Sequence, residues 1–211
     1  QRWDEALAAA ADARTRFPDD FNLALLQAKA LIHLARPVEA VEILGSIQVL
    51  PSEGGRESHR LWEQAHILAA LDALEGGDPE EARAHALAAM EWPESLGQGR
   101  PYEPEERLPR FLLGEAEGRL GNASLARESF QAVVDGTPGI QAVLSGGSLN
   151  RPFSRLDLLA VPALEALGRA ADAEQLWAAW REEARPLLDD AEEGLETRMF
   201  DRAAALREIG R

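Results

Sequence analysis

Three residues with metal-ligating side chains share one face of a predicted helix. His59, Glu63 and His66 are four and three residues apart, and side chains at these spacings meet on one side of an α-helix. Two imidazoles and a carboxylate would bind a zinc-like cation if the fold supplied a fourth ligand. The alternative is packing between helices, which is ordinary for a histidine at the position of His66. The chain has no cysteine, so zinc–thiolate sites, iron–sulfur clusters and cysteine nucleophiles are excluded.

Two glycine-rich segments are candidates for a nucleotide-binding loop or a catalytic loop, but neither segment fits the known sequence patterns of such loops. Gly97 and Gly99 lie in the stretch EWPESLGQGRPYEPEE (91–106). A dinucleotide-binding loop needs a preceding strand and a third glycine that opens a helix, whereas a predicted helix precedes Gly97. The segment SGGS (145–148) has no histidine near it in sequence and is predicted to be a connector. We therefore expect no catalytic residue, no cofactor and no enzymatic activity in this chain.

A repeating pattern predicts the elements that would position these residues. An alanine, mostly preceded by an acidic residue, recurs at intervals of 34, 42, 44 and 47 residues: Ala6, Ala40, Ala82, Ala126 and Ala173. In the same frame, the position where one helix would cross the next is occupied by Ala28, Ala70, Gly114 and Val161. Three of these four residues are small, and Val161 is the exception. Small residues let helix axes approach to about 8–10 Å. The pattern indicates successive helical hairpins.

Turn and stop signals recur at fixed places in this frame. Glycine readily takes the left-handed conformation that ends a helix, and the turn inside each hairpin falls at Ala35, Gly77, Gly121 and Gly168. A proline follows each second helix: Pro18, Pro51, Pro93, Pro138 and Pro186. The frame resembles the 34-residue tetratricopeptide (TPR) repeat over residues 1–186, although most of the consensus aromatic residues are missing.

This resemblance implies an all-α fold, namely a TPR-like α-solenoid of helix-turn-helix repeats in a right-handed superhelix with a C-terminal capping helix. We expect a single domain over residues 1–211, with a partial repeat at 1–18, a cap at 187–211, and full repeats at about 21–51, 63–93, 107–138 and 154–186. The expected helices span about 2–16, 21–35, 38–48, 57–76, 79–91, 104–120, 123–135, 153–167, 170–184 and 187–209. Because the chain begins within a helical pattern and without Met, we interpret it as a fragment of a longer protein.

Composition narrows the choice of partner. The chain is 45% hydrophobic and carries a formal net charge of −15, so it should fold, and its surface should repel nucleic acid backbones and anionic lipid. Its best apolar run is too short to span a membrane. We expect the partner to be a protein, a peptide segment or an upstream domain of the same chain. The lack of cysteine favours a cytoplasmic location.

One candidate surface is the concave face that the first helices of TPR repeats line. Lys29, Phe111 and Arg119 would lie there, among several apolar residues. The TPR proteins that hold a C-terminal carboxylate use a clamp of lysine and asparagine side chains, and this groove has a single lysine. It fits an apolar or amphipathic segment better.

The loops between repeats form the second candidate surface. The repeat spacings of 42, 44 and 47 residues exceed the TPR period by 8, 10 and 13 residues, and these extra residues lie in the loops. Each loop contains glycines followed by an arginine: Arg56, Arg100 and Arg151. Arginine and aromatic side chains often anchor interfaces, so these arginines, together with Trp92 and Tyr102, form a predicted edge surface for an anionic, sugar-like or protein partner. The alternative is that the arginines bind neighbouring carbonyl groups and close the loops.

The segment AMEWPESLGQGRPYEPEERLPRFLLGEAEGRLG (89–121) carries a second resemblance. It is similar to the TPR region of large bacterial proteins whose upstream part is a β-sandwich domain of unknown function, related to sugar-binding or sugar-processing domains. The sequence thus predicts a non-catalytic scaffold for protein or domain interactions. The alternative is an accessory C-terminal region of a larger bacterial carbohydrate-active or carbohydrate-binding protein, with carbohydrate bound only through that parent protein.

Overall fold

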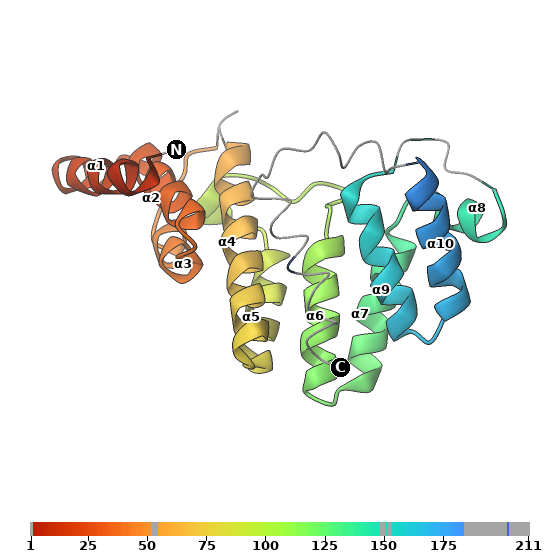
Figure 1. Ribbon diagram of the computed structural model, residues 1–211. Coiled ribbons are helices and arrows are strands. Elements are labelled where there is room, and N and C mark those ends of the chain that lie inside the picture. The colour runs from red at the N-terminus through yellow and green to blue at the C-terminus, as the bar shows by residue number, and fades with distance from the viewer. Residues whose placement is uncertain (1, 52–54, 148–150, 152, 184–201, 203–211) are drawn as a thin grey trace. The chain divides into compact units, whose positions relative to one another are not determined.

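A computed structural model describes residues 2–51, 55–147, 151, 153–183 and 202 of the chain (Figure 1). Within these residues the chain is helical and contains no strand, which confirms the predicted all-α class. The helices follow one another as α1 (Trp3–Arg16), α2 (Phe21–His33), α3 (Pro37–Gly45), α4 (Gly55–Gly76), α5 (Pro79–Ala89), the 3₁₀ helix η1 (Glu94–Leu96), α6 (Arg107–Arg119), α7 (Ala123–Asp135), α8 (Ile140–Leu144), the 3₁₀ helix η2 (Arg155–Leu159), α9 (Ala160–Ala166) and α10 (Ala170–Glu183).

The chain forms two compact units. The first consists of residues 1–72 and 84–104, and the second of residues 73–83 and 105–211. Apart from Arg202, the predicted capping helix at 187–211 lies outside the described residues, and so do the last residues of the fourth predicted repeat, 184–186.

In the first unit, α2 packs against both α1 and α3. The ring of Trp3 stacks on that of His33, with centroids 3.9 Å apart, and the Arg14 guanidinium donates to Gln27 Oε1 at 2.6 Å, so both ends of α1 are fixed to α2. Alanines in the interface allow this close packing, since Ala28 and Ala40 are fully buried. The Asp20 side chain accepts the backbone N–H of Asn22 and caps the start of α2.

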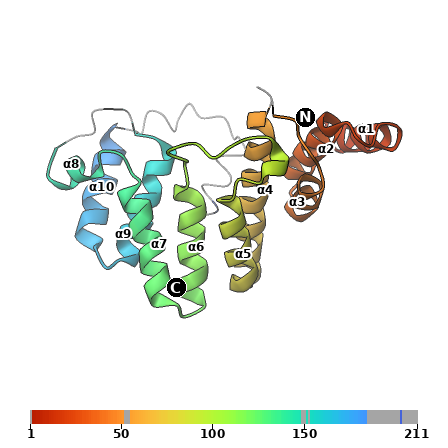
Figure 2. The ribbon, with the colours of Figure 1, turned by 180° about the vertical axis from the view of Figure 1, so that it is seen from behind.

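In the second unit, α7 packs against both α6 and α9, and α10 packs against α8 and α9 (Figures 1 and 2). The Phe130 ring of α7 lies over Gly114 of α6, where a Cβ atom would be only 2.7 Å from the ring. Phe130 also meets Phe111 edge to face, with ring centroids 5.8 Å apart. The glycine is therefore required for the close contact between α6 and α7.

Four turns between consecutive helices have the same geometry, as the sequence frame predicts. Their central residues have positive φ: Ala35 (55°), Gly77 (80°), Gly121 (80°) and Gly168 (78°). In each turn the next residue donates its N–H to the carbonyl five positions earlier, as Arg36 does to Leu31 and Asp78 does to Ala73. This bond and its inner companion form the Schellman motif. The predicted position of the turn inside each helical pair is confirmed.

The ends of several helices differ from the prediction. The helix expected over 38–48 ends at Gly45, because the Ser46 hydroxyl bonds to the carbonyl of Ile43 and Val49 turns into the core. The helix expected over 79–91 ends at Ala89. The one expected over 104–120 begins only at Arg107 and ends at Arg119.

The region after α7 differs most. The sequence predicted a connector there, but five residues form α8, which begins after Gly139 in the left-handed conformation (φ 79°). A five-residue helix is too short to show helical periodicity in a sequence. The helix expected over 153–167 starts instead as the 3₁₀ turn η2 and becomes α9 at Ala160.

Candidate functional site

The loop that follows α5 is held to the body of the first unit by backbone groups. The N–H of Val49 donates to the carbonyl of Ser95 at 2.7 Å, and the Ser58 hydroxyl donates to the carbonyl of Leu96 at 2.7 Å. Gly97 has a φ of 69°, and a Cβ atom there would lie 2.8 Å from the carbonyl oxygen of Val49. The glycine thus serves a tight backbone contact, as expected for a connector.

Trp92, a predicted partner-binding residue, packs within the first unit. Its ring stacks on His59 with centroids 3.3 Å apart and planes 8° apart. His59 Nε2 lies 3.1 Å from the carbonyl oxygen of Glu91, and burial lowers the pKa of His59 despite this bond. The neutral imidazole and the indole together fasten the start of the loop to α4.

The sequence favours no metal site and offers His59, Glu63 and His66 only as candidates, and these contacts do not bring the three together. His66 Nδ1 lies 2.8 Å from His85 Nδ1 of α5, so one ring donates a hydrogen bond to the other. Burial, with a smaller contribution from His85, lowers the pKa of His66 to about 4. In the described part of the chain, no group of three or more His, Cys, Asp or Glu side chains could hold a metal ion. His59 faces Trp92 and His66 faces His85, so the packing alternative describes both histidines.

Three other predicted residues of the first unit lie at its surface. Arg56 and Arg100 are exposed, and Tyr102 is 98% exposed, the largest value among the exposed large apolar or aromatic side chains of the described residues. An aromatic side chain this exposed contributes nothing to the packing of the unit and is available to a partner. Arg100 and Tyr102 are two residues apart on the loop that Gly97 closes.

Arg151, the corresponding arginine of the second unit, has a structural partner. It donates two hydrogen bonds to the buried carboxylate of Asp157, at 2.8 and 2.9 Å, and one to the carbonyl of Pro138. Arg107 donates to the same carboxylate at 2.7 Å, and the N–H of Ser154 donates at 2.6 Å. Burial opposes ionisation of Asp157, but bonds from Arg151, Ser154 and Arg107 outweigh it and lower its pKa. Arg151 therefore binds residues of its own unit. The alternative interpretation expected carbonyl partners, and Pro138 is one, but the main partner is the carboxylate of Asp157, which was not predicted.

The three residues predicted to line a concave groove are engaged in different ways. Lys29 forms an ion pair with Glu57 at 2.9 Å, and the Arg119 guanidinium donates to the carbonyl of Leu74 at 2.5 Å. Phe111 is fully buried against Phe130, so its predicted place on an open binding face is wrong. The position of an aromatic residue in a TPR-like frame does not show which face of its helix is buried by a neighbouring helix.

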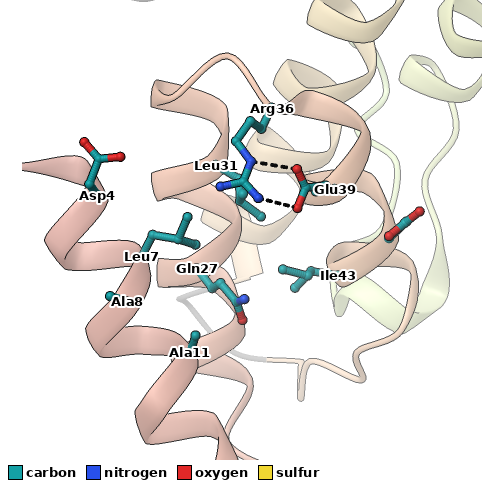
Figure 3. A pocket seen from close by; sticks show the side chains of 10 residues that line it. Asp4, Leu7, Ala8, Ala11, Gln27, Leu31, Arg36, Glu39 and Ile43 are labelled. Atoms are coloured by element: carbon teal, nitrogen blue, oxygen red, sulfur yellow. Dashed lines mark hydrogen bonds and ion pairs between the residues drawn. The ribbon is translucent and has the colours of Figure 1, made fainter.

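The sequence prediction missed a pocket in the first unit. Its volume is about 390 Å³, and it is lined by α1, by α2 with the turn that follows it, and by α3 (Figure 3). Its lining residues are Asp4, Leu7, Ala8, Ala11, Gln27, Leu31, Arg36, Glu39, Glu42 and Ile43. The interior is apolar and the rim is charged. Ala8 and Ala11 are three positions apart on one face of α1, but Ala6 and Ala9 have the same spacing, so the sequence does not single out the pocket.

The charges on the rim of this pocket are not balanced. Arg36 donates two hydrogen bonds of 2.6 Å to Glu39 (Figure 3), and these bonds lower the pKa of Glu39. Asp4 also acts on Arg36, because its charge contributes to raising the pKa of that guanidinium. The rim therefore carries three carboxylates, Asp4, Glu39 and Glu42, against the single positive charge of Arg36, which leaves a net charge of about −2.

Comparison with protein-family models, with curated proteins and with solved structures finds no match to this chain. None of the helices in the described ranges is both long and apolar enough to cross a membrane.

Proposed function

We propose that the chain is a non-catalytic helical-repeat scaffold that binds a segment of another protein or an adjoining domain, with its hairpins arranged as TPR-like repeats in a right-handed superhelix. The observation that supports this most is the recurrence of one turn geometry at Ala35, Gly77, Gly121 and Gly168, at the spacing of the sequence repeat. Stacked hairpins of one design form extended binding surfaces. The cysteine-free composition suits a cytoplasmic scaffold.

The packing of the titratable groups supports a non-catalytic role. His59 stacks on Trp92, His66 bonds to His85, and Asp157 binds two arginines. Each of these groups is buried and has a structural partner, whereas a general acid or base must reach a substrate. Tyr102, by contrast, is almost fully exposed beside Arg100, as the anchors of an unoccupied interface are.

A second candidate function rests on the segment 89–121, which resembles the TPR region of bacterial proteins with an upstream β-sandwich domain. That resemblance favours an accessory role in a larger carbohydrate-active or carbohydrate-binding protein. The segment includes the loop of Arg100 and Tyr102 and the whole of α6. In this case, the loop would contact the adjoining domain.

Display of random peptides against the immobilised chain, run beside a glycan array, separates these functions. The scaffold proposal expects enrichment of related peptides that bind the whole chain and compete with one another. It expects no glycan to bind. The double variant Arg100→Ala/Tyr102→Ala tests the loop, with Arg127→Ala as the matched exposed arginine on α7. A display without any enriched peptide would contradict the proposal, and glycan binding would favour the second candidate.

A further inference from the structure

We propose that the pocket between α1, α2 and α3 binds a basic and apolar segment of a partner protein, with a leucine-like side chain inside and an arginine or lysine at the rim. This proposal rests on the proposed scaffold function and assigns it a site and a class of ligand. It is independent of the loop that carries Arg100 and Tyr102, which does not line the pocket.

The interior of the pocket is built to receive an apolar group. Leu31 of α2 is only 2% exposed and forms part of the base, while Leu7 and Ala11 of α1 and Ile43 of α3 are partly exposed around it. Figure 3 shows Leu7, Leu31 and Ile43 on three different helices around one space. An apolar side chain placed there would remove both itself and these carbon atoms from water.

Small residues on α1 keep this space open. Ala8 and Ala11 both line it, and a larger side chain at either position would extend into the volume of about 390 Å³. That volume is near the lower end of the range of about 300–1,000 Å³ for ligand pockets. It suits one or two side chains of a bound segment rather than a whole helix.

The rim determines the charge of the ligand. Asp4 on α1 and Glu42 on α3 both line the pocket, and Arg36 is already bound to Glu39. The two remaining negative charges would attract a cationic side chain and repel an acidic one, which favours specificity and a fast association rate. The chain itself has a net charge of −15, so a second copy of it is a poorer match than a basic partner.

The direct test is a fluorescence-polarisation titration of the whole chain with a labelled twelve-residue peptide of alternating leucine and arginine pairs. A peptide with glutamate in place of each arginine is the control ligand. We expect the arginine peptide to bind and the glutamate peptide not to bind. Binding of both, or of neither, would overturn the proposal.

Two variants of α1 locate the binding. Ala8→Trp would fill the pocket, whereas Ala9→Trp adds the same group to the neighbouring exposed position, which does not line it. Ala8→Trp is expected to lower the affinity for the arginine peptide about tenfold or more. Ala9→Trp is expected to change this affinity less than about twofold. Circular dichroism confirms that both variants fold. Equal effects of the two variants would place the peptide elsewhere and overturn the proposal.

Charge variants separate the rim from the overall charge. Glu42→Lys and Asp19→Lys change the net charge equally, but only Glu42 lines the pocket. At about 0.15 M salt, Glu42→Lys is expected to lower the affinity for the arginine peptide about fivefold to tenfold. Asp19→Lys is expected to lower it less than about twofold. Equal losses would show that binding follows net charge alone.

The outcomes also separate this proposal from the scaffold function. If displayed peptides bind the chain but are unaffected by Ala8→Trp, the scaffold proposal stands and the pocket proposal fails. If no displayed peptide binds at all, the scaffold proposal fails first. Sedimentation equilibrium tests the remaining occupant: a dimer that Ala8→Trp dissociates would assign the pocket to a second copy and overturn the proposal of a basic partner.

Discussion

The loop before α6 and the loop before η2 look alike in sequence, since glycines precede an arginine in both, yet the structure uses them differently. In the first unit, Trp92 and backbone bonds close the loop, and Tyr102 beside Arg100 is 98% exposed. In the second unit, Arg151 itself closes the loop by binding the buried Asp157. The difference teaches that a glycine turn followed by an arginine does not reveal from sequence which side chain closes the loop: it is Trp92 in one unit and Arg151 in the other.

The largest expected effect concerns the closed loop of the second unit. Asp157→Asn removes the buried carboxylate that Arg107 and Arg151 share, while Arg107 keeps its ion pair with Glu105. Because the amide N–H2 of Asn would face the donors of Arg151 and Ser154, the variant should lose about 3 kcal/mol of the free energy of unfolding. Urea denaturation measures it. Asp172→Asn, which breaks the more exposed pair with Arg169, is the matched control and should cost less than about 1 kcal/mol. If the two variants lose equal stability, the Asp157 cluster does not organise its unit.

The two units should also differ in their response to acid. His66 has a pKa of about 4 in the folded chain and an ordinary value of 6.5, so the unfolded chain binds its proton first. Stability should therefore fall as the pH falls from 6.5 to 4, by at most about 3 kcal/mol. The pKa of Asp157 is lowered from 3.8, so its stabilisation is full above that pH and is lost only as the pH falls through its lower folded value.

Urea denaturation at pH 7.5 and pH 4.5 measures the contribution of His66. The variant His66→Asn removes the titrating group, and the difference between the two pH values should become smaller than in the original chain. His33→Asn is a control on a partly exposed histidine. A pH dependence that His66→Asn leaves unchanged would contradict the burial assigned to this imidazole.

A smaller effect tests the close packing inside the second unit. Gly114→Ala would place a Cβ atom 2.7 Å from the Phe130 ring and should destabilise the chain by about 1–3 kcal/mol. Gly118→Ala lies on the same helix, and its nearest neighbour would be 3.9 Å away, so the better helix propensity of alanine should stabilise by about 0.5–1 kcal/mol. Thermal unfolding compares them. If both variants shift the unfolding temperature in the same direction, α6 and α7 do not approach as closely as described.

The smallest expected effect on stability concerns the open loop of the first unit. Arg100→Ala/Tyr102→Ala should change the free energy of unfolding by less than about 0.5 kcal/mol, because both side chains are exposed. Trp92→Ala in the same loop removes the stacked partner of His59 and is the positive control. A large loss in the double variant would mean that this loop is closed by its arginine, like that of the second unit.

The sequence predicted best what depends on local geometry. Gly77, Gly121 and Gly168 lie at the turns because only neighbouring residues decide a left-handed helix end, and even Ala35 takes a positive φ there. Pairings between distant residues were not predictable, since Arg107 and Asp157 are separated by fifty positions. The pocket was missed for the same reason: Ala8 of α1 and Ile43 of α3 line one space although they are far apart in the sequence.

The measurement that tests the central claim most directly is a calorimetric titration of the whole chain with the peptide most enriched in display. The scaffold account predicts saturable binding of one peptide per chain, with no chemical change in the peptide recovered afterwards. Absence of heat for every enriched peptide, or recovery of a cleaved or modified peptide, would contradict the claim that this chain is a non-catalytic binding scaffold.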